Sequence, residues 1–102
     1  MGHWLLIMQP NLECVEIFDS LGCSGKSLKR LRRYSSVVLY NQTRLQGPTS
    51  KKCGLFCVYV AYWRLLNIDQ TLSEAMSDIF TTDYTKNDKI VVDFEAEYCD
   101  GT

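Results

Sequence analysis

The sequence predicts an α+β domain in which a small mixed β-sheet packs on a central buried helix. Three observations support this fold class. Short runs of strand-forming residues fill the first part of the chain, a long apolar run occupies the middle, and helix signals dominate the last third. A chain of 102 residues is expected to form a single domain. Its core would lie between the sheet and the helices that cover it.

The first two predicted strands form a hairpin. Residues 4–9 (WLLIMQ) are a short apolar run, and Pro10-Asn11 is the turn signal that ends it. Residues 13–18 (ECVEIF) alternate apolar residues with glutamates, which is typical of a half-buried strand. Two short strands joined by a few turn residues predict a β-hairpin, and residues 19–22 (DSLG) end its second strand.

A basic helix and a third strand follow the hairpin. Residues 24–34 (SGKSLKRLRRY) place Leu28, Leu31 and Tyr34 three positions apart and carry five lysines and arginines elsewhere. This pattern predicts an amphipathic helix with a basic face. The basic face is either a solvated helix surface or a patch that contacts nucleic acid or an acidic partner. Residues 36–40 (SVVLY) are rich in β-branched residues and predict a third strand.

A polar loop and the most apolar segment occupy the middle of the chain. Residues 41–52 (NQTRLQGPTSKK) are polar and contain Gly47-Pro48, so a loop is predicted. Residues 53–66 (CGLFCVYVAYWRLL) are apolar on nearly every side, with Arg64 as their only charge. They predict a buried central helix. Its aromatic residues are expected in the core: Phe56, Tyr59, Tyr62 and Trp63.

Two further helices complete the predicted fold. Residues 71–74 (TLSE) match a capping box, in which a threonine and a glutamate each satisfy a backbone N–H at the helix start. They open a helix that is expected to end at about Phe80. A last helix is expected from about Asn87 to about Tyr98. All these elements are expected to belong to one domain over residues 1–102.

Composition excludes several functional classes. Hydrophobic residues make up 46% of the chain and the net charge is −1, so the overall charge gives no sign of a nucleic-acid or membrane partner. The longest apolar stretch, residues 54–63, is about half as long as a bilayer requires. No basic region precedes the apolar N-terminal residues, so no secretory signal is expected. With five cysteines and no such signal, an intracellular, reducing environment is expected.

Cys53 stands where the polar loop ends and the apolar helix begins. A thiol at a helix N-terminus feels the positive end of the helix dipole, and Lys51 and Lys52 add positive charge, so the nucleophilic thiolate is favoured. The Gln46 amide can donate a hydrogen bond to an oxyanion, together with the backbone N–H of Cys53. His3 is the only histidine and therefore the only imidazole base that the chain offers.

Asp19 ends the strand that neighbours the strand after His3, so its carboxylate can orient the imidazole. The chain therefore contains a nucleophile, a base, an orienting carboxylate and an oxyanion donor: Cys53, His3, Asp19 and Gln46. No metal or organic cofactor is expected. A zinc site built from Cys53, Cys57 and His3 has poor ligand spacing.

Each of these residues also has a purely structural interpretation. Cys53 and Cys57 can be core residues of the helix, because free cysteine is among the most buried residue types. His3 can be an exposed terminal residue, Asp19 can cap the turn after its strand, and Gln46 can lie on the loop surface.

Three groups of residues carry a resemblance to a known family: His3-Trp4, Phe18-Asp19-Ser20, and residues 46–57, which read QGPTSKKCGLFC. The chain resembles the adenovirus-type and ubiquitin-like-protein-specific cysteine peptidases. The third group is similar to the adenovirus protease, and Asp19-Ser20 is similar to the deSUMOylating branch. Protease domains of virus-like DNA transposons, the Polinton or Maverick group, look similar as well. The resemblance covers about residues 2–66.

The resemblance implies the ubiquitin-like-protein protease fold, which is the adenain-like cysteine proteinase fold. Family catalytic domains are longer and have elements before the histidine, so the chain would correspond to the C-terminal part of such a domain. Cys53 would attack the scissile carbonyl, and His3 would take and return the proton. Asp19 would orient His3, while Gln46 and the Cys53 N–H would bind the oxyanion. Trp4 would shape a narrow channel that favours glycine in the substrate.

The implied activity is a cysteine-type endopeptidase that cuts a protein or peptide after glycine. The substrate would be a viral-type or transposon-type precursor or a ubiquitin-like modifier, and the place of action would be the nucleus or a particle. Whether an activating peptide or DNA is needed stays open. The alternative is a catalytically inactive, protease-derived module that binds a protein or nucleic acid through the basic helix, with Lys29, Arg30, Arg32 and Arg33 as its contacts.

Overall fold

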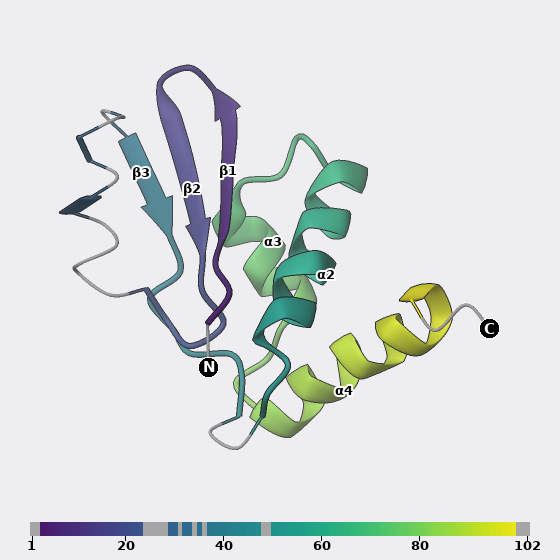
Figure 1. Cartoon of the computed structure of the whole chain (residues 1–102). Coiled ribbons are helices and arrows are strands. Elements are labelled where there is room, and N and C mark those ends of the chain that lie inside the picture. Colours follow the sequence, from purple (N-terminus) through teal and green to yellow (C-terminus); the bar gives the residue numbers. More distant parts are fainter. Residues whose placement is uncertain are drawn as a thin grey trace.

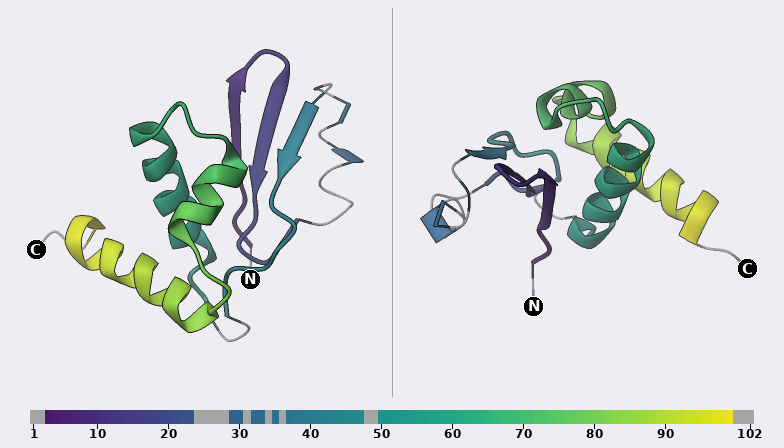
Figure 2. Two further views of the ribbon diagram at one scale, coloured as in Figure 1. Left: turned by 180° about the vertical axis from the view of Figure 1, so that it is seen from behind. Right: turned by 90° about the horizontal axis from the view of Figure 1, so that it is seen from above.

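The protein is an α+β domain with a mixed three-stranded sheet on one side and helices on the other (Figures 1 and 2). A computed structural model describes residues 3–23, 29–30, 32–33, 35, 37–47 and 50–99. Its strands are β1 (Leu6–Asn11), β2 (Cys14–Phe18) and β3 (Val37–Tyr40). Its helices are α2 (Cys53–Leu66), α3 (Leu72–Ile79) and α4 (Tyr84–Phe94), which continues into a π-helical turn, η1 (Glu95–Cys99).

The basic helix predicted over residues 24–34 lies largely outside the described residues. Lys29 and Arg30, which are described, are helical and exposed. The two interpretations of the basic face therefore stay predictions.

Strand β2 is the centre of the sheet. It pairs with β1 antiparallel, with Leu6 opposite Phe18, and with β3 parallel, with Ile17 opposite Tyr40. The predicted hairpin is confirmed, but the predicted turn at Pro10-Asn11 is wrong, because both residues belong to β1 and the turn lies at Leu12-Glu13. The first strand begins at Leu6 and not at Trp4. The reason is that β2 ends at Phe18, so within the described part of the chain no strand continues beside residues 3–5.

The core lies between the sheet and the helices, and the ring of Phe80 joins its two sides. This ring stacks on Phe18 of β2 with a centroid separation of 6.2 Å and on Phe56 of α2 with a separation of 5.6 Å. Both of those side chains are fully buried. Aliphatic residues from α2, α3 and α4 complete the core: Val60, Ala75, Ile79 and Val91.

Helix α2 has the predicted bounds but not the predicted burial. Its buried residues lie on one face, and they are Phe56, Cys57, Val60 and Arg64. Val58, Leu65 and Leu66 are exposed. The expectation of a helix buried on nearly every side is therefore wrong. The physical reason is that the described sheet and helices contact only part of the circumference of α2. The residues on its other side stay exposed although they are apolar.

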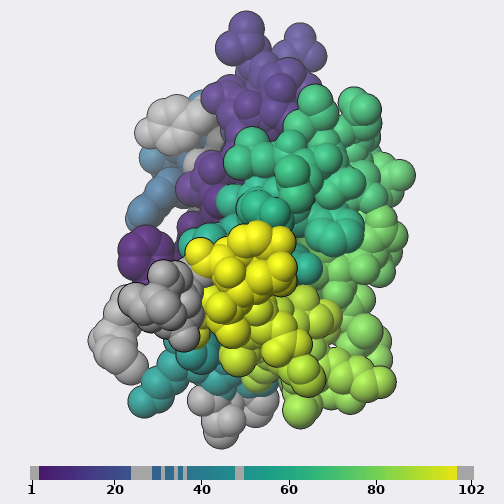
Figure 3. Space-filling model, turned by 90° about the vertical axis from the view of Figure 1, so that its right-hand side faces the viewer, coloured from purple at the N-terminus to yellow at the C-terminus, as the bar shows by residue number. Residues whose placement is uncertain are grey.

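The aromatic residues of α2 are buried to different degrees. Phe56 is fully buried, as predicted, and Tyr59 and Trp63 are half-buried. Tyr62 is exposed over 37% of its surface, so its predicted place in the core is wrong. Its ring instead packs near the surface, 5.3 Å from that of Phe94, where the C-terminal helix lies in front of α2 (Figure 3).

A buried ion pair connects the sheet to α2. The Arg64 guanidinium contacts the Glu16 carboxylate of β2 at 2.6 Å, and both side chains are at least nine-tenths buried. Arg64 also donates to the backbone oxygen of Gln70. The single charge on the apolar segment is thus an internal link between two layers of the fold.

The two later helices begin at side-chain caps. At α3 the Thr71 hydroxyl accepts from the Glu74 N–H, and the Glu74 carboxylate accepts from the Thr71 N–H, which confirms the capping box. Helix α4 begins at Tyr84, earlier than the predicted Asn87, because the Asp83 carboxylate caps it. No helix in the described part of the chain is both long and apolar enough to cross a membrane.

Candidate active site

Four of the residues that the sequence singled out line one pocket. It has a volume of about 880 Å³, and its lining includes His3, Trp4, Gln46 and Cys53. The pocket forms where the segment before β1 meets the loop before α2 and the first turn of α2. Asp19 does not line the pocket and reaches it through His3.

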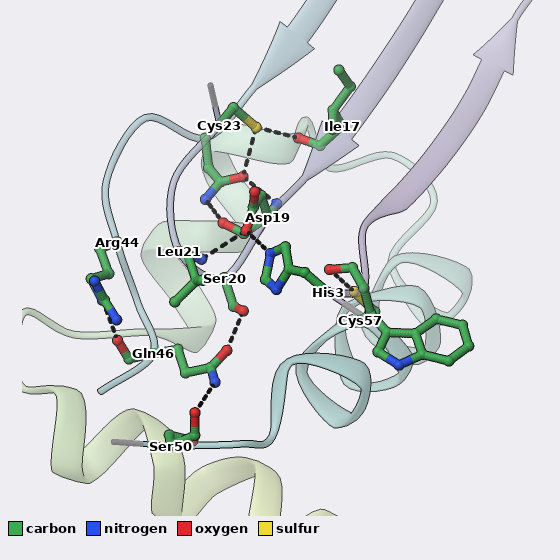
Figure 4. Close-up of polar contacts among 12 residues, drawn as sticks. His3, Ile17, Asp19, Ser20, Leu21, Cys23, Arg44, Gln46, Ser50 and Cys57 are labelled. Carbon is green, nitrogen blue, oxygen red and sulfur yellow. Dashed lines mark hydrogen bonds and ion pairs between the residues drawn. The ribbon is translucent and has the colours of Figure 1, made fainter. Parts of the chain in front are cut away.

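The imidazole of His3 is oriented by Asp19. Nε2 of His3 lies 2.6 Å from Oδ1 of Asp19 (Figure 4). Because Asp19 accepts at Nε2, the other ring nitrogen, Nδ1, is left to exchange a proton with a neighbour in the pocket. The Asp19 side chain is nearly buried, whereas that of His3 is about one-third exposed. His3 is thus exposed, as its structural interpretation expected, but its imidazole is also paired with Asp19.

Asp19 is itself held on several sides. Its Oδ1 accepts from the N–H of Leu21 at 2.9 Å, as in a turn capped by its own side chain. The side-chain amide of Asn41 makes two hydrogen bonds to the backbone of Asp19. Its Oδ1 accepts from the Asp19 N–H at 2.9 Å, and its Nδ2 donates to the Asp19 oxygen at 2.6 Å. Asp19 therefore caps its turn and orients His3 at the same time.

Sequence reasoning missed Asn41 because its role depends on strand pairing. Asn41 directly follows β3, and the parallel pairing of Ile17 with Tyr40 brings it beside Asp19. A prediction of this contact required the parallel register of two strands that are far apart in the sequence. The polar residue directly after the third strand was the only signal.

Gln46 is buried, with 2% of its surface exposed. Its side-chain oxygen accepts from the Ser20 hydroxyl, and its Nε2 donates to the backbone oxygen of Ser50 at 2.7 Å. An amide nitrogen carries two hydrogens, so the second one remains for an acceptor in the pocket. The interpretation of Gln46 as a loop-surface residue is wrong.

Cys53 is the first residue of α2, as predicted, and its side chain is partly exposed to the pocket. The side chain of Lys52, which stands at the helix cap, makes no capping hydrogen bond. The first N–H groups of a helix lack partners within the helix, and together with the helix dipole they favour an anion at this end. The start of α2 therefore suits the negative oxygen that develops during acyl transfer.

Trp4 lies over the first turn of α2. A Cβ atom added at Gly54 would stand only 3.2 Å from Cδ1 of the Trp4 ring, so glycine permits this close approach. The backbone oxygen of Trp4 also accepts from the Cys57 thiol at 3.5 Å. These contacts hold the segment that carries His3 against the helix that carries Cys53.

Cys14, Cys23 and Cys57 are suited to remain thiols. Burial is the main cause that raises the pKa of Cys57 to about 12, and the charges of Cys53 and Asp19 add to it. Burial also raises the pKa of Cys23 and of Cys14, with smaller effects from Asp19 and Glu16 respectively. Cys14, Cys23, Cys53 and Cys57 are free thiols. No group of three or more metal-ligating side chains occurs among the described residues.

No protein-family model matches this chain, and no curated protein matches it either. The arrangement of the site consists of a thiol at a helix start, an imidazole oriented by a carboxylate, and a buried amide with one N–H that has no acceptor among the described residues. This set of groups can perform acyl transfer through a thioester.

Proposed function

We propose that this protein is a cysteine endopeptidase of the adenovirus-type and ubiquitin-like-protein-specific kind, with the corresponding fold. One observation carries the proposal: the imidazole of His3, paired with Asp19 at 2.6 Å, lines the same pocket as Cys53 and Gln46. These residues come from three separate parts of the chain. A purely structural role for each of them does not explain why they meet at one pocket.

The proposed reaction has two halves. In the first, Nδ1 of His3 takes the thiol proton of Cys53, and the sulfur attacks the scissile carbonyl to form a tetrahedral intermediate. The negative oxygen accepts from Nε2 of Gln46 and from the Cys53 N–H, while Asp19 stabilises the imidazolium. His3 then gives the proton to the leaving amine, and a thioester to Cys53 remains.

The second half releases the acyl group. His3 takes a proton from a water molecule, and the resulting hydroxide attacks the thioester carbonyl. The second tetrahedral intermediate uses the same two donors as the first. Collapse breaks the C–S bond, the proton returns to the Cys53 sulfur, and the carboxylic acid leaves. No redox step is involved.

The substrate is proposed to carry glycine at the cleavage site, as in a ubiquitin-like modifier or a processed precursor. Trp4 supports this choice, because its ring stands against Gly54 beside the nucleophile and narrows the approach to it. A side chain on the residue next to the scissile bond would meet the indole, whereas glycine would not.

Replacing Gly54 with alanine tests the part played by Trp4. The added methyl group displaces the indole, and we expect kcat/KM for a glycine-containing peptide to fall roughly tenfold, because small misplacements near a reacting centre are costly. The free energy of unfolding should not fall, since alanine favours a helix over glycine by about 0.5–1 kcal/mol. Urea unfolding and peptide kinetics measure the two effects. Unchanged kinetics would show that the Trp4 contact does not shape the site.

Selective labelling of Cys53 tests the proposed nucleophile. A peptide that ends in a glycine vinyl sulfone should modify Cys53 near neutral pH, as located by mass spectrometry. Cys14, Cys23 and Cys57 should stay unmodified, because their raised pKa values keep them protonated. As the pH rises, labelling should extend to the other thiols, with Cys57 last.

The same labelling experiment includes its own controls. Replacing His3 with alanine should slow the modification of Cys53, whereas replacing the remote Cys14 should not. Equal labelling of Cys53 and Cys14, or no effect of the His3 change, would contradict the proposal.

A further inference from the structure

We propose that Ser20 is a positioning residue that orients the amide of Gln46 for oxyanion binding. This inference rests on the proposed peptidase function and deepens it. Asp19 orients the base and Ser20 orients the oxyanion donor, so two adjacent residues at the end of β2 arrange both parts of the site. The sequence motif Asp19-Ser20 then has a physical reason for each of its members.

The contact between Ser20 and Gln46 is fully enclosed. Ser20 has no exposed surface and Gln46 has 2%. The Ser20 hydroxyl donates to Oε1 of Gln46, and Nε2 of Gln46 donates to the Ser50 oxygen (Figure 4). The oxygen of the amide therefore has a hydrogen-bond donor, and its nitrogen has an acceptor.

These two partners select one of the two orientations of the amide. If the amide turned by half a revolution, its oxygen would face the Ser50 oxygen, and two acceptors would then meet in a partly buried place. A buried polar group without a partner costs about 1–3 kcal/mol. In the observed orientation Nε2 is on the Ser50 side, which is the side of the loop that leads to Cys53.

The side chain and the backbone of Ser20 have separate roles. The Ser20 backbone oxygen accepts from the N–H groups of Leu45 and Gln46 at 2.8 and 3.0 Å, and this fixes the loop. Alanine at position 20, which is smaller than serine, would keep those two bonds. Removing only the hydroxyl therefore leaves the loop attached and frees the amide.

Without the hydroxyl, Oε1 of Gln46 would be buried with no donor. The amide would then rotate toward other partners, and its free N–H would spend less time facing the oxyanion position. Loss of one oxyanion donor costs about 100- to 1000-fold in kcat. For a donor that is present but disordered, we expect a smaller loss of roughly 10- to 100-fold in the Ser20→Ala variant, with KM little changed.

The first test observes the amide directly and does not depend on catalysis. Nitrogen-15 relaxation of the Gln46 side-chain amide should show a rigid group in the full wild-type chain and a mobile one in Ser20→Ala. Ser35→Ala is the matched control, because Ser35 is also buried and donates to the Glu13 oxygen at 2.8 Å. A mobile amide in the wild type, or an equally rigid one in Ser20→Ala, would overturn the inference.

The second test separates a positioning role from a structural one. In a Gln46→Ala background, Ser20→Ala should cause no further loss of kcat, because the group that it positions is gone. If the two losses multiply, Ser20 acts independently of Gln46 and the inference fails. Absence of any Cys53-dependent cleavage by the wild type would instead contradict the proposed function, and the relaxation experiment would still decide the role of Ser20.

Discussion

Replacing Cys53 with alanine should abolish peptide cleavage, with kcat falling on the order of a million-fold, as when other covalent peptidases lose their nucleophile. The reason is that the neighbouring thiol of α2 cannot take its place. Cys57 is one helical turn away, but burial raises its pKa to about 12, and its S–H already donates to the Trp4 oxygen. The measurement is the release of a fluorescent amine from a peptide amide with glycine at the cleavage site.

The control for this experiment is Cys14→Ala. Cys14 begins β2, at the end of that strand opposite to Asp19, and it does not line the pocket. Its replacement should leave kcat and KM unchanged. Circular dichroism should show that the Cys53→Ala chain keeps its fold, because the lost sulfur lies at the partly exposed start of α2. Cleavage that persists in folded Cys53→Ala would exclude the proposed mechanism.

Local signals predicted most of the secondary structure. The hairpin was predicted although its turn was placed too early, because Pro10 and Asn11 belong to β1 and the turn lies at Leu12-Glu13. The helix bounds at Cys53 and Leu66 follow from an abrupt change of polarity. The capping box at Thr71 was equally clear. The early start of α4 was missed although Asp83 is a favoured capping residue, because no apolar repeat begins there.

The contacts that arrange the site could not be predicted in the same way. The residues proposed to react were found because their chemistry is rare in the chain: a single histidine, and a cysteine at a change of polarity. The residues that hold them are common polar types, Asn41 and Ser20, and nothing local distinguishes them from turn residues. Their partners lie 22 and 26 positions away, so their roles depend on how the strands and the loop pack.

The exposed face of α2 shows that burial, too, could not be predicted from local sequence alone. Composition indicates how apolar a segment is, but it does not indicate which neighbours will cover it. Leu65 and Leu66 stand at the end of the helix beyond the core contacts of Phe56 and Val60, and they are exposed. Arg64, the only charge in the segment, is buried instead, because Glu16 lies opposite it on β2.

Replacing Arg64 with methionine is the change expected to destabilise the fold most. Methionine keeps the aliphatic length of the side chain but leaves the Glu16 carboxylate, whose side chain is 3% exposed, without its partner. Removing one member of a buried ion pair typically costs about 3–5 kcal/mol. Since a domain of this size has about 5–15 kcal/mol of stability, the midpoint of urea unfolding should fall by a large fraction.

The exposed ion pair of α4 is the matched control. Lys89 contacts Asp93 at 2.7 Å, and both side chains are more than 60% exposed. Lys89→Met should therefore cost no more than about 0.5 kcal/mol, because solvent screens the pair. Replacing Glu16 and Arg64 together by methionine should recover most of the loss, since the penalty comes from the stranded charge and not from the missing attraction. If Arg64→Met cost as little as Lys89→Met, the pair would not link the sheet to α2, and the apolar contacts of Phe80 would have to carry that role alone.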